Sequence, residues 1–314
     1  MNGGFTIDER HENLGGKMDD FCDGPAAGWV RFRWGCGHRL HTSQDQVYAE
    51  PILREFEQQT GIAVRAVYDS EAVKTVGLVN RLIAEKANPQ CDLFWNNEEF
   101  RTHQLASMDV LDEGQSVETF GARTRQWVWN TNQLSRAALP KDLTSLTNTL
   151  WRGKVVIALP LFGSTATHFQ VLRQQWGEKR WRDWCRALKA NDVMTVDGNS
   201  VVVQLVGRGE VALGLTDSDD VRAGRKNGLP IAGQSLSQDG FSISNSIGYI
   251  AGAPRPDLAK RLAKYLQSKP VIDSLVSAGA LDRGASDAPA DIAWPSVVKE
   301  NERAVADLKS IYLD

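Results

Sequence analysis

The sequence has no run of about 18 apolar residues, so it predicts no membrane-spanning helix. It also lacks the common catalytic signatures: there is no P-loop GxxxxGK motif, no GxGxxG after a strand, no GxSxG and no HExxH. An enzymatic function therefore has no motif to support it. These absences favour a protein that binds its ligand without carrying out chemistry on it.

Neither sign of charge is in excess, because 36 basic and 39 acidic residues leave a formal net charge of -3. This balance gives no indication of nucleic acid or an anionic membrane surface as a partner. The four cysteines include no CxxC pair, and no histidine stands at metal-ligand spacing from them. Neither a zinc site nor a disulfide scaffold is indicated, and the pairing of the cysteines stays open.

Residues 1–38 are polar, glycine-rich and irregular, and we expect them to be a leader outside the folded part. They contain no apolar h-region of the kind that a secretory signal has. The stretch 33–37 is weakly similar to the surroundings of a lipidated cysteine, but an irregular or mis-started leader is the preferred interpretation.

A length of 314 residues suggests two domains, at the usual size of about 100–200 residues each. From Arg39 on, apolar strand-like runs alternate with amphipathic helical patterns, which is typical of parallel α/β sheets. The expected strands are 39–42, 62–68, 91–95, 126–129, 155–159, 193–196, 211–215 and a pair around 241–250. The expected helices include 165–176, 181–190, 200–208, 256–267, 270–278 and 294–311, besides two early ones around 48–56 and 76–83, and 233–240 is expected to be a connector.

Five polar clusters fall where a predicted strand ends and the next helix begins, at 43–45, 96–98, 163–165, 197–200 and 217–220. In open parallel sheets, ligands bind beyond the carboxyl ends of the strands, where helix N-termini present free N–H groups. We therefore expect the five clusters to converge on one cleft.

Two of these clusters carry chemistry but also have a simpler interpretation. Residues 163–165 could hold a phosphate, carbonate or carboxylate at a helix N-terminus, or Ser164 or Thr165 could be an ordinary helix cap. The acidic residues of 217–220 could also cap a helix, yet three carboxylates within four residues repel one another unless a cation or donors lie nearby. A carboxylate at Glu98, directly after a buried strand, would likewise need a partner.

Three tryptophans at or near these strand ends, Trp95, Trp127 and Trp129, could stack on a ligand or pack in the core. Packing is the preferred interpretation. His103 and His168 are interpreted as helix-surface residues, and neither is predicted to bind a metal.

Five segments in the same order resemble the family 1 extracellular solute-binding proteins of bacterial ABC importers, the iron(III)-binding periplasmic group. They are TSQDQVYAEP at 42–51, DLFWNNE at 92–98, PLFGSTATH at 160–168, VDGNS at 196–200 and GLTDSDD at 214–220. The resemblance spans about 39 to about 282. It implies the α/β periplasmic-binding-protein type II fold, in which crossing hinge strands join two α/β lobes around an interlobe cleft.

The resemblance also implies a division of the chain. It makes 1–38 the leader, 39–128 plus 238–282 the N-terminal lobe, and 129–237 plus 283–314 the C-terminal lobe. The hinge strands are expected to cross near 127–131 and 233–240.

The resemblance further implies a set of site residues. Iron binders of the family hold Fe(III) with a His, a Glu and two adjacent tyrosines, and with a synergistic anion at a helix N-terminus. Carried over by position, the His becomes Asp45, the Glu becomes Asn97 with Glu98 beside it, and the tyrosines become Asp219 and Asp220. The implied metal ligands are Asp45, Glu98, Asp219 and Asp220, within a ligand-binding set of Ser43, Asp45, Asn97, Glu98, Ser164, Thr165, Ala166, Asn199, Asp217, Asp219 and Asp220. Carboxylates in place of phenolates still suit a hard cation such as Fe3+.

The function implied is that of the substrate-binding component of an ABC importer. Such a protein captures a metal ion, iron(III) by resemblance, and delivers it to a membrane permease driven by an ATPase. It is expected to be a monomer on the periplasmic or extracellular side, although no signal peptide is visible, and to have no cofactor besides the bound ion and its anion. Two alternatives stay open: a binding protein for a small organic anion or zwitterion, such as a phosphonate or sugar phosphate, and a cytosolic sensor or enzyme domain on the same fold.

Overall fold

The computed structural model describes residues 38–68, 76–114, 117–236, 239–282 and 292–313. Residues 36–314 form one compact unit. The expected leader, apart from His38, lies outside the described residues. Among the helices that are described, none is both long enough and apolar enough to cross a bilayer.

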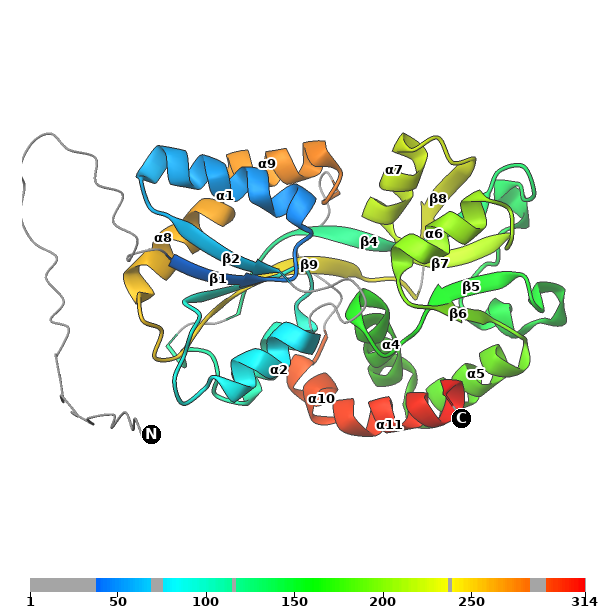
Figure 1. Cartoon of the computed structure of the whole chain (residues 1–314). Coiled ribbons are helices and arrows are strands. Elements are labelled where there is room, and N and C mark those ends of the chain that lie inside the picture. The colour runs from blue at the N-terminus through cyan, green and yellow to red at the C-terminus, as the bar shows by residue number, and fades with distance from the viewer. Residues whose placement is uncertain (1–37, 69–75, 115–116, 237–238, 283–291, 314) are drawn as a thin grey trace, which may run out of the picture. The chain divides into compact units, whose positions relative to one another are not determined.

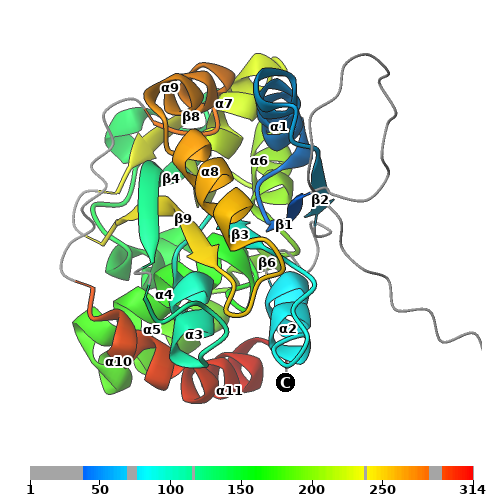
Figure 2. The ribbon, with the colours of Figure 1, turned by 90° about the vertical axis from the view of Figure 1, so that its left-hand side faces the viewer.

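The first lobe, as we call it, is built on three parallel strands and the helices that follow them. Strand β1 (His38–Thr42) pairs with β2 (Val64–Tyr68) and β3 (Leu93–Asn96). Helix α1 (Gln46–Thr60) packs on one face together with α8 (Pro256–Leu266) and α9 (Lys269–Ala278), while α2 (Val76–Ala84) and α3 (Phe100–Ser107) cover the other (Figures 1 and 2). Helix α1 ends at Thr60, and its C-cap Gly61 adopts a left-handed conformation with φ 70°, which favours glycine.

The second lobe repeats this layering. Strand β5 (Val155–Ala158) pairs in parallel with β6 (Met194–Val196) and β7 (Leu213–Asp217). Helices α4 (Gly163–Trp176), α5 (Glu178–Ala190) and α11 (Asn301–Tyr312) cover one face, and α6 (Asn199–Gly207) and α7 (Ser218–Lys226) cover the other (Figure 1). Three short 3-10 helices lie between Asn130 and β5, at Arg136–Ala138, Thr144–Thr147 and Thr149–Trp151.

One long strand, β4 (Glu118–Asn130), runs through both lobes. Its residues 118–124 pair antiparallel with β9 (Ser242–Tyr249), which in turn pairs with β3. Its residues 125–130 pair antiparallel with β7 and with β8 (Ile231–Ser235). The partners of β4 therefore change between Thr124 and Arg125, a few residues before the crossing expected at 127–131. The chain passes back to the first lobe between β8 and β9, and this segment overlaps the crossing expected at 233–240.

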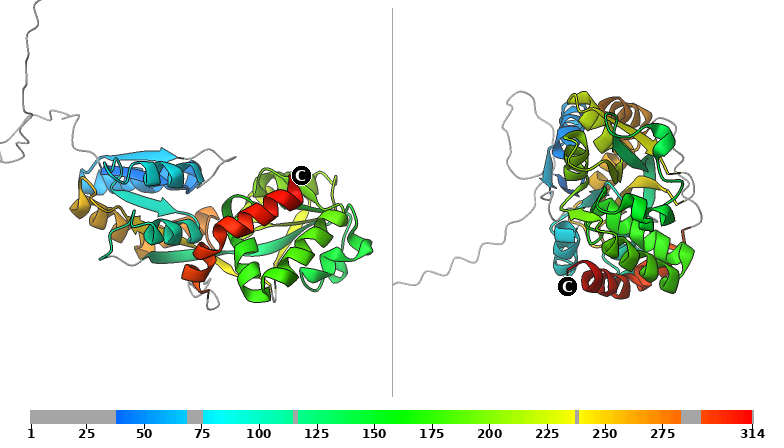
Figure 3. Two further views of the ribbon diagram at one scale, coloured as in Figure 1. Left: turned by 90° about the horizontal axis from the view of Figure 1, so that it is seen from below. Right: turned by 90° about the vertical axis from the view of Figure 1, so that its right-hand side faces the viewer.

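Several elements differ from the expectation. The sheet is mixed, because β4, β8 and β9 are antiparallel to their neighbours, and the expected strand pair around 241–250 is the single strand β9. Helix α3 was not predicted, and the expected helix 294–311 is two helices, α10 (Trp294–Lys299) and α11, with Glu300 between them. Because the helix is broken at Glu300, α10 packs against α3 and α4, while α11 packs against α4 and α5 (Figure 3).

Candidate functional site

A pocket of about 80 Å3 lies beyond the carboxyl ends of the strands of both lobes. All five predicted polar clusters contribute to its wall, as expected of an open α/β sheet. The wall consists of Asp45, Asn97, Arg123, Ala158, Leu159, Phe162, Gly163, Ser164, Thr165, Asp197, Gly198, Asn199, Ser200, Asp217, Asp219 and Asp220.

Three helices of the second lobe, α4, α6 and α7, begin at this pocket. The amides of the first turn have no acceptor within their own helix, so those of Gly163, Ser164 and Thr165 can serve an anion. The Ala166 amide donates to the Phe162 carbonyl at 3.1 Å and so belongs to the hydrogen-bond ladder of the helix; Ala166, expected in the ligand-binding set, is not among the wall residues. The positive ends of the α4 and α6 dipoles favour a negative group here.

Asp217 is buried at the end of β7, and donors surround its carboxylate. Its Oδ1 accepts from Arg125 at 2.6 Å, and its Oδ2 accepts from Ser164 at 2.6 Å and from Arg123 and Asn199 at 3.2 Å each. Although burial opposes ionisation, these two arginines and the hydrogen bonds hold the pKa of Asp217 below its usual range. The Ser164 hydroxyl therefore donates to Asp217, and the carboxylate of Asp217 has few lone pairs left with which to bind a metal ion.

The two arginines were not predicted as site residues. Arg123 lines the pocket, and Arg125 lies fully buried behind it. Because they stand at alternate positions of β4, they point to the same face, and buried charges require partners. The RxR pair at 123 and 125, just before the apolar run 127–129, was the signal that could have indicated them. Their guanidinium groups neutralise Asp217 and bring β4 into the wall of the site.

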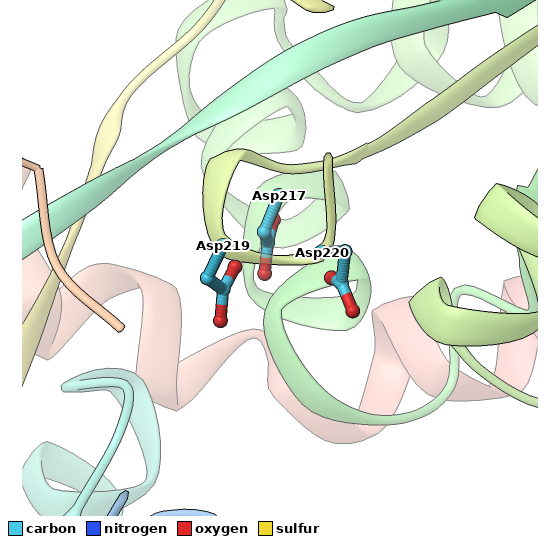
Figure 4. A group of neighbouring side chains, drawn as sticks. All are labelled: Asp217, Asp219 and Asp220. Carbon is cyan, nitrogen blue, oxygen red and sulfur yellow. The ribbon is translucent and has the colours of Figure 1, made fainter. Parts of the chain in front are cut away.

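The carboxylates of Asp217, Asp219 and Asp220 project from one turn toward the same region (Figure 4). One oxygen of each lies within 4.8 Å of the others. Burial first, and then the charges of Asp217 and Asp45, raise the pKa of Asp219 to about 6, against the opposing effect of Arg123. The Asp219 Oδ1 atom is buried and has no hydrogen-bond donor among the described residues, and the nearest cation is Arg123 Nε at 3.5 Å. The turn therefore presents a carboxylate that a cation would stabilise.

The first lobe contributes Asp45 and Asn97 to the opposite wall. Ser43 stands behind Asn97, where its hydroxyl accepts from the Asn97 backbone N–H at 3.0 Å and lies 3.0 Å from the side-chain oxygen. The Asn97 carbonyl accepts from Arg123 Nη1 at 2.5 Å. Ser43 thus orients a pocket residue and is not itself among the wall residues.

Glu98, expected as a metal ligand, is held away from the pocket. Its carboxylate accepts from the backbone N–H groups of Phe100 at 2.7 Å and Arg101 at 3.3 Å, so it caps the start of α3. It also accepts from Thr167 of α4 at 3.0 Å, which joins the two lobes. Burial raises the pKa of Glu98, and its carboxylate oxygens already accept from Phe100, Arg101 and Thr167, so it stabilises the structure around the site.

The aromatic and histidine side chains near the site are packed. All three tryptophans, Trp95, Trp127 and Trp129, are buried within the cores of the two lobes, which agrees with the interpretation that they pack in the core. His168 is also buried, contrary to the expected surface position, and its Nε2 lies 2.6 Å from the Asp239 carbonyl. Burial, with the nearby charge of Arg125, lowers the pKa of His168 to about 3, so the ring is neutral.

The family described as "Bacterial extracellular solute-binding protein" matches residues 44–281. This match covers most of the chain, and the protein belongs to that family. A shorter alignment, 34% identical over 94 residues, relates it to an Fe(3+)-binding periplasmic protein of Serratia marcescens. That alignment spans only 30% of this chain and 27% of the relative.

Solved structures share the fold over nearly the whole described chain. Iron-bound HitA of Pseudomonas aeruginosa aligns with a TM-score of 0.78 at 18% identity, covering 88% of this chain and 100% of the other. AfuA of Actinobacillus pleuropneumoniae, with fructose-6-phosphate bound, aligns with a TM-score of 0.74 at 17% identity, over 87% and 98% of the two chains. Apo ferric ion-binding protein A of Pasteurella haemolytica aligns with a TM-score of 0.75 at 15% identity, over 89% and 99%. The chain thus has the type II periplasmic-binding-protein fold, which confirms the predicted fold class.

Proposed function

We propose that this protein is the substrate-binding component of an ABC importer and that it captures a hard metal ion, iron(III) or one like it, in the pocket between its lobes. In this proposal Asp219 and Asp220 bind the ion from the second lobe, and Asp45 and Asn97 approach it from the first. The ion is cargo, which a membrane permease with its ATPase receives on the extracytoplasmic side. We expect a monomer that carries out no chemistry on its ligand.

The observation that carries this proposal is the unsatisfied carboxylate of Asp219 within a three-aspartate turn. Oxygen ligands from carboxylates and amides are those that hard cations prefer. Arg125 pairs with Asp217, and Arg123 lies between Asp217 and Asp219, so two arginines face three carboxylates and the turn keeps a net negative charge. Relatives of similar fold are described as ferric-binding proteins, which supports a metal ion as cargo.

A small organic anion or zwitterion, such as a sugar phosphate, is the second candidate. The open N-termini of α4 and α6 favour it, and a protein of the same fold binds fructose-6-phosphate. The three aspartates beside these N-termini favour the cation as the first candidate, because carboxylates repel an anion that binds without a cation.

Calorimetric titration of chelator-stripped protein with Fe(III)-citrate and with divalent ions tests the first candidate. We expect binding by the wild type and a loss of at least about 100-fold in affinity for Asp219→Ala/Asp220→Ala, because each lost charge-assisted contact is worth roughly 1.5–3 kcal/mol. The matched control is Asp183→Ala on α5, where the carboxylate pairs only with Lys179 at the surface.

Each possible outcome of this titration decides between the candidates. If the wild type binds none of the ions, or if the double variant binds as well as the wild type, the metal proposal is wrong. Binding of fructose-6-phosphate or phosphate that chelators do not affect and that Thr165→Val weakens would instead establish the second candidate.

A further inference from the structure

The helix that carries the carboxylates, α7, is fastened to the first lobe by Arg222, one turn beyond Ser218 and Asp219. The Arg222 Nε atom donates to the carbonyl of Gly279 at 2.9 Å, and its Nη1 forms an ion pair with Asp282. A third guanidinium nitrogen lies 3.4 Å from the Ser218 hydroxyl at the start of α7. All three donating nitrogens of this side chain thus have acceptors.

Asp282 contacts two elements, α7 and β4, through its carboxylate and its backbone N–H. Oδ1 accepts from Ser218 Oγ at 2.8 Å, and Oδ2 accepts from Thr124 Oγ1 at 2.9 Å. Its own N–H donates to the Ala122 carbonyl at 2.8 Å. Asp282 therefore meets β4 next to the point where that strand changes partners, and it joins the segment after α9 to the first turn of α7. Figure 1 shows the end of α9 facing α7 from the other lobe.

The surroundings favour this contact over an ordinary surface ion pair. Gly279 is the left-handed cap of α9, with φ 93°, so its carbonyl lies at the negative end of the helix dipole, where a cation is stabilised. The side chains of Arg222 and Asp282 are 37% and 17% exposed, against 83% and 61% for the surface pair Lys269–Asp273. Exposed pairs of the second kind contribute little.

We propose that Arg222 and Asp282 form a clasp that positions the turn bearing Asp219 and Asp220, so that cargo affinity depends on two residues that do not line the pocket. This inference rests on the proposed capture of a cation. Ligand groups bind an ion well only when they are held close to their bound geometry by supporting contacts. Without the clasp, the first turn of α7 keeps its attachment to β7 and its contacts with Arg123 and Thr124 of β4, but it loses its attachment to the segment after α9.

The test compares Arg222→Met with Arg225→Met. Arg225 is an exposed residue of the same helix, so its substitution removes the same charge without touching α9. We expect Arg222→Met to weaken Fe(III) binding by about 10- to 100-fold, the range of supporting residues at metal sites, mainly through faster release. Arg225→Met should stay within about 2-fold of the wild type. Asp282→Asn should weaken binding as well, and the double variant should lose less than the product of the two single losses.

Hydrogen exchange of the chelator-stripped protein gives a readout that needs no cargo. We expect faster exchange of the amides of 219–224 in Arg222→Met and Asp282→Asn, but not in Arg225→Met. If the wild type binds no cation, the proposed function fails while this exchange experiment still tests the clasp. If cation binding is intact in the wild type and equally strong in Arg222→Met and Asp282→Asn, the positioning role is overturned, whatever the exchange rates show. If Arg222→Met does not fold, Asp282→Asn and Arg225→Met alone decide the question.

Discussion

Asp217 and Asp219 are two positions apart and have opposite pKa shifts. Asp217 accepts from two arginines, a serine and an asparagine, and these donors favour its ionised form. Asp219 is partly buried beside other carboxylates, and its pKa is raised to about 6. The same residue type is therefore part of the scaffold at one position and a candidate ligand at the other, because the donors around each differ.

The raised pKa of Asp219 predicts that cation affinity depends on pH. Because an ion displaces the proton, affinity should be nearly constant above about pH 7 and fall about tenfold per unit below pH 6. The stability of the cargo-free protein depends on pH in the opposite sense. Ionisation of the partly buried Asp219 carboxyl, with its raised pKa, reduces stability as pH rises from about 4 through 6. Titrations and melting curves at pH 5, 6 and 7 measure both.

The control for this pH prediction is Asp219→Asn. Without its cargo, this variant should be more stable than the wild type at pH 7 and less distinguishable from it at pH 5. Parallel curves for the two proteins across this range would contradict the assignment of the titration to Asp219.

At this scale, the sequence predicts residue types and their place on the chain but not their partners. Asp219, Asp220 and Asn97 could be expected in the pocket because they follow strand ends. The neutralisation of Asp217 could not, since it depends on Arg123 and Arg125, which meet it only through the antiparallel pairing of β4 with β7. Contacts over more than 90 positions of sequence follow from the pairing of strands, which local patterns do not specify.

The N-terminus of α3 explains why Glu98 has another role than ligand. A carboxylate that accepts from the first amides of a helix stabilises it, typically by about 1 kcal/mol, and interacts well with the helix dipole. We expect Glu98→Ala to lower the free energy of unfolding by about 1–3 kcal/mol in urea, because the amides of Phe100 and Arg101 and the Thr167 hydroxyl lose their acceptor.

Cation affinity separates this capping role from the expected role as ligand. Glu98→Gln keeps an acceptor oxygen, so it should cost less stability than Glu98→Ala and leave cation affinity within about threefold, since conservative swaps outside a site change little. If Glu98→Gln weakened cation binding as strongly as Asp219→Asn, Glu98 would have to be returned to the ligand set.

Most elements were predictable from periodicity, and the exceptions have identifiable reasons. Only 126–129 of the 13-residue strand β4 was expected, because Arg123, Thr124 and Arg125 interrupt its apolar pattern where it crosses between the lobes. The single helix expected at 294–311 bends at Glu300, since α10 turns to place Trp294 on the ring of His103, with centroids 5.1 Å apart. Tertiary contacts overrode local preference at both places.

At the scale of the whole molecule, the sequence predicted the fold class because alternating strands and helices leave few arrangements of a sheet. The family match and the solved structures confirm this class. The division into lobes at 128/129 and 237/238 stays a prediction; the change of strand partners at Thr124 and Arg125 suggests a division slightly earlier in the chain.

The pocket combines walls of opposite charge, which predicts that a cation and a small anion bind together. Asp219 and Asp220 face the region into which the α4 and α6 N-termini also open, so each ion reduces the repulsion that the other meets. We expect saturating bicarbonate to raise cation affinity by about 5- to 150-fold, the usual range of coupling between sites. By linkage, the cation must raise bicarbonate affinity by the same factor.

Paired titrations, each ion in the absence and presence of the other, measure this coupling. Thr165→Val removes one hydroxyl from the anion wall and leaves the carboxylates in place, so it should reduce the coupling factor while the cation affinity without bicarbonate stays near that of the wild type. Asp220→Asn should do the reverse, lowering cation affinity even without the anion. If bicarbonate and phosphate both leave cation affinity unchanged, the two walls act independently, and the helix N-termini then have no part in holding the cargo.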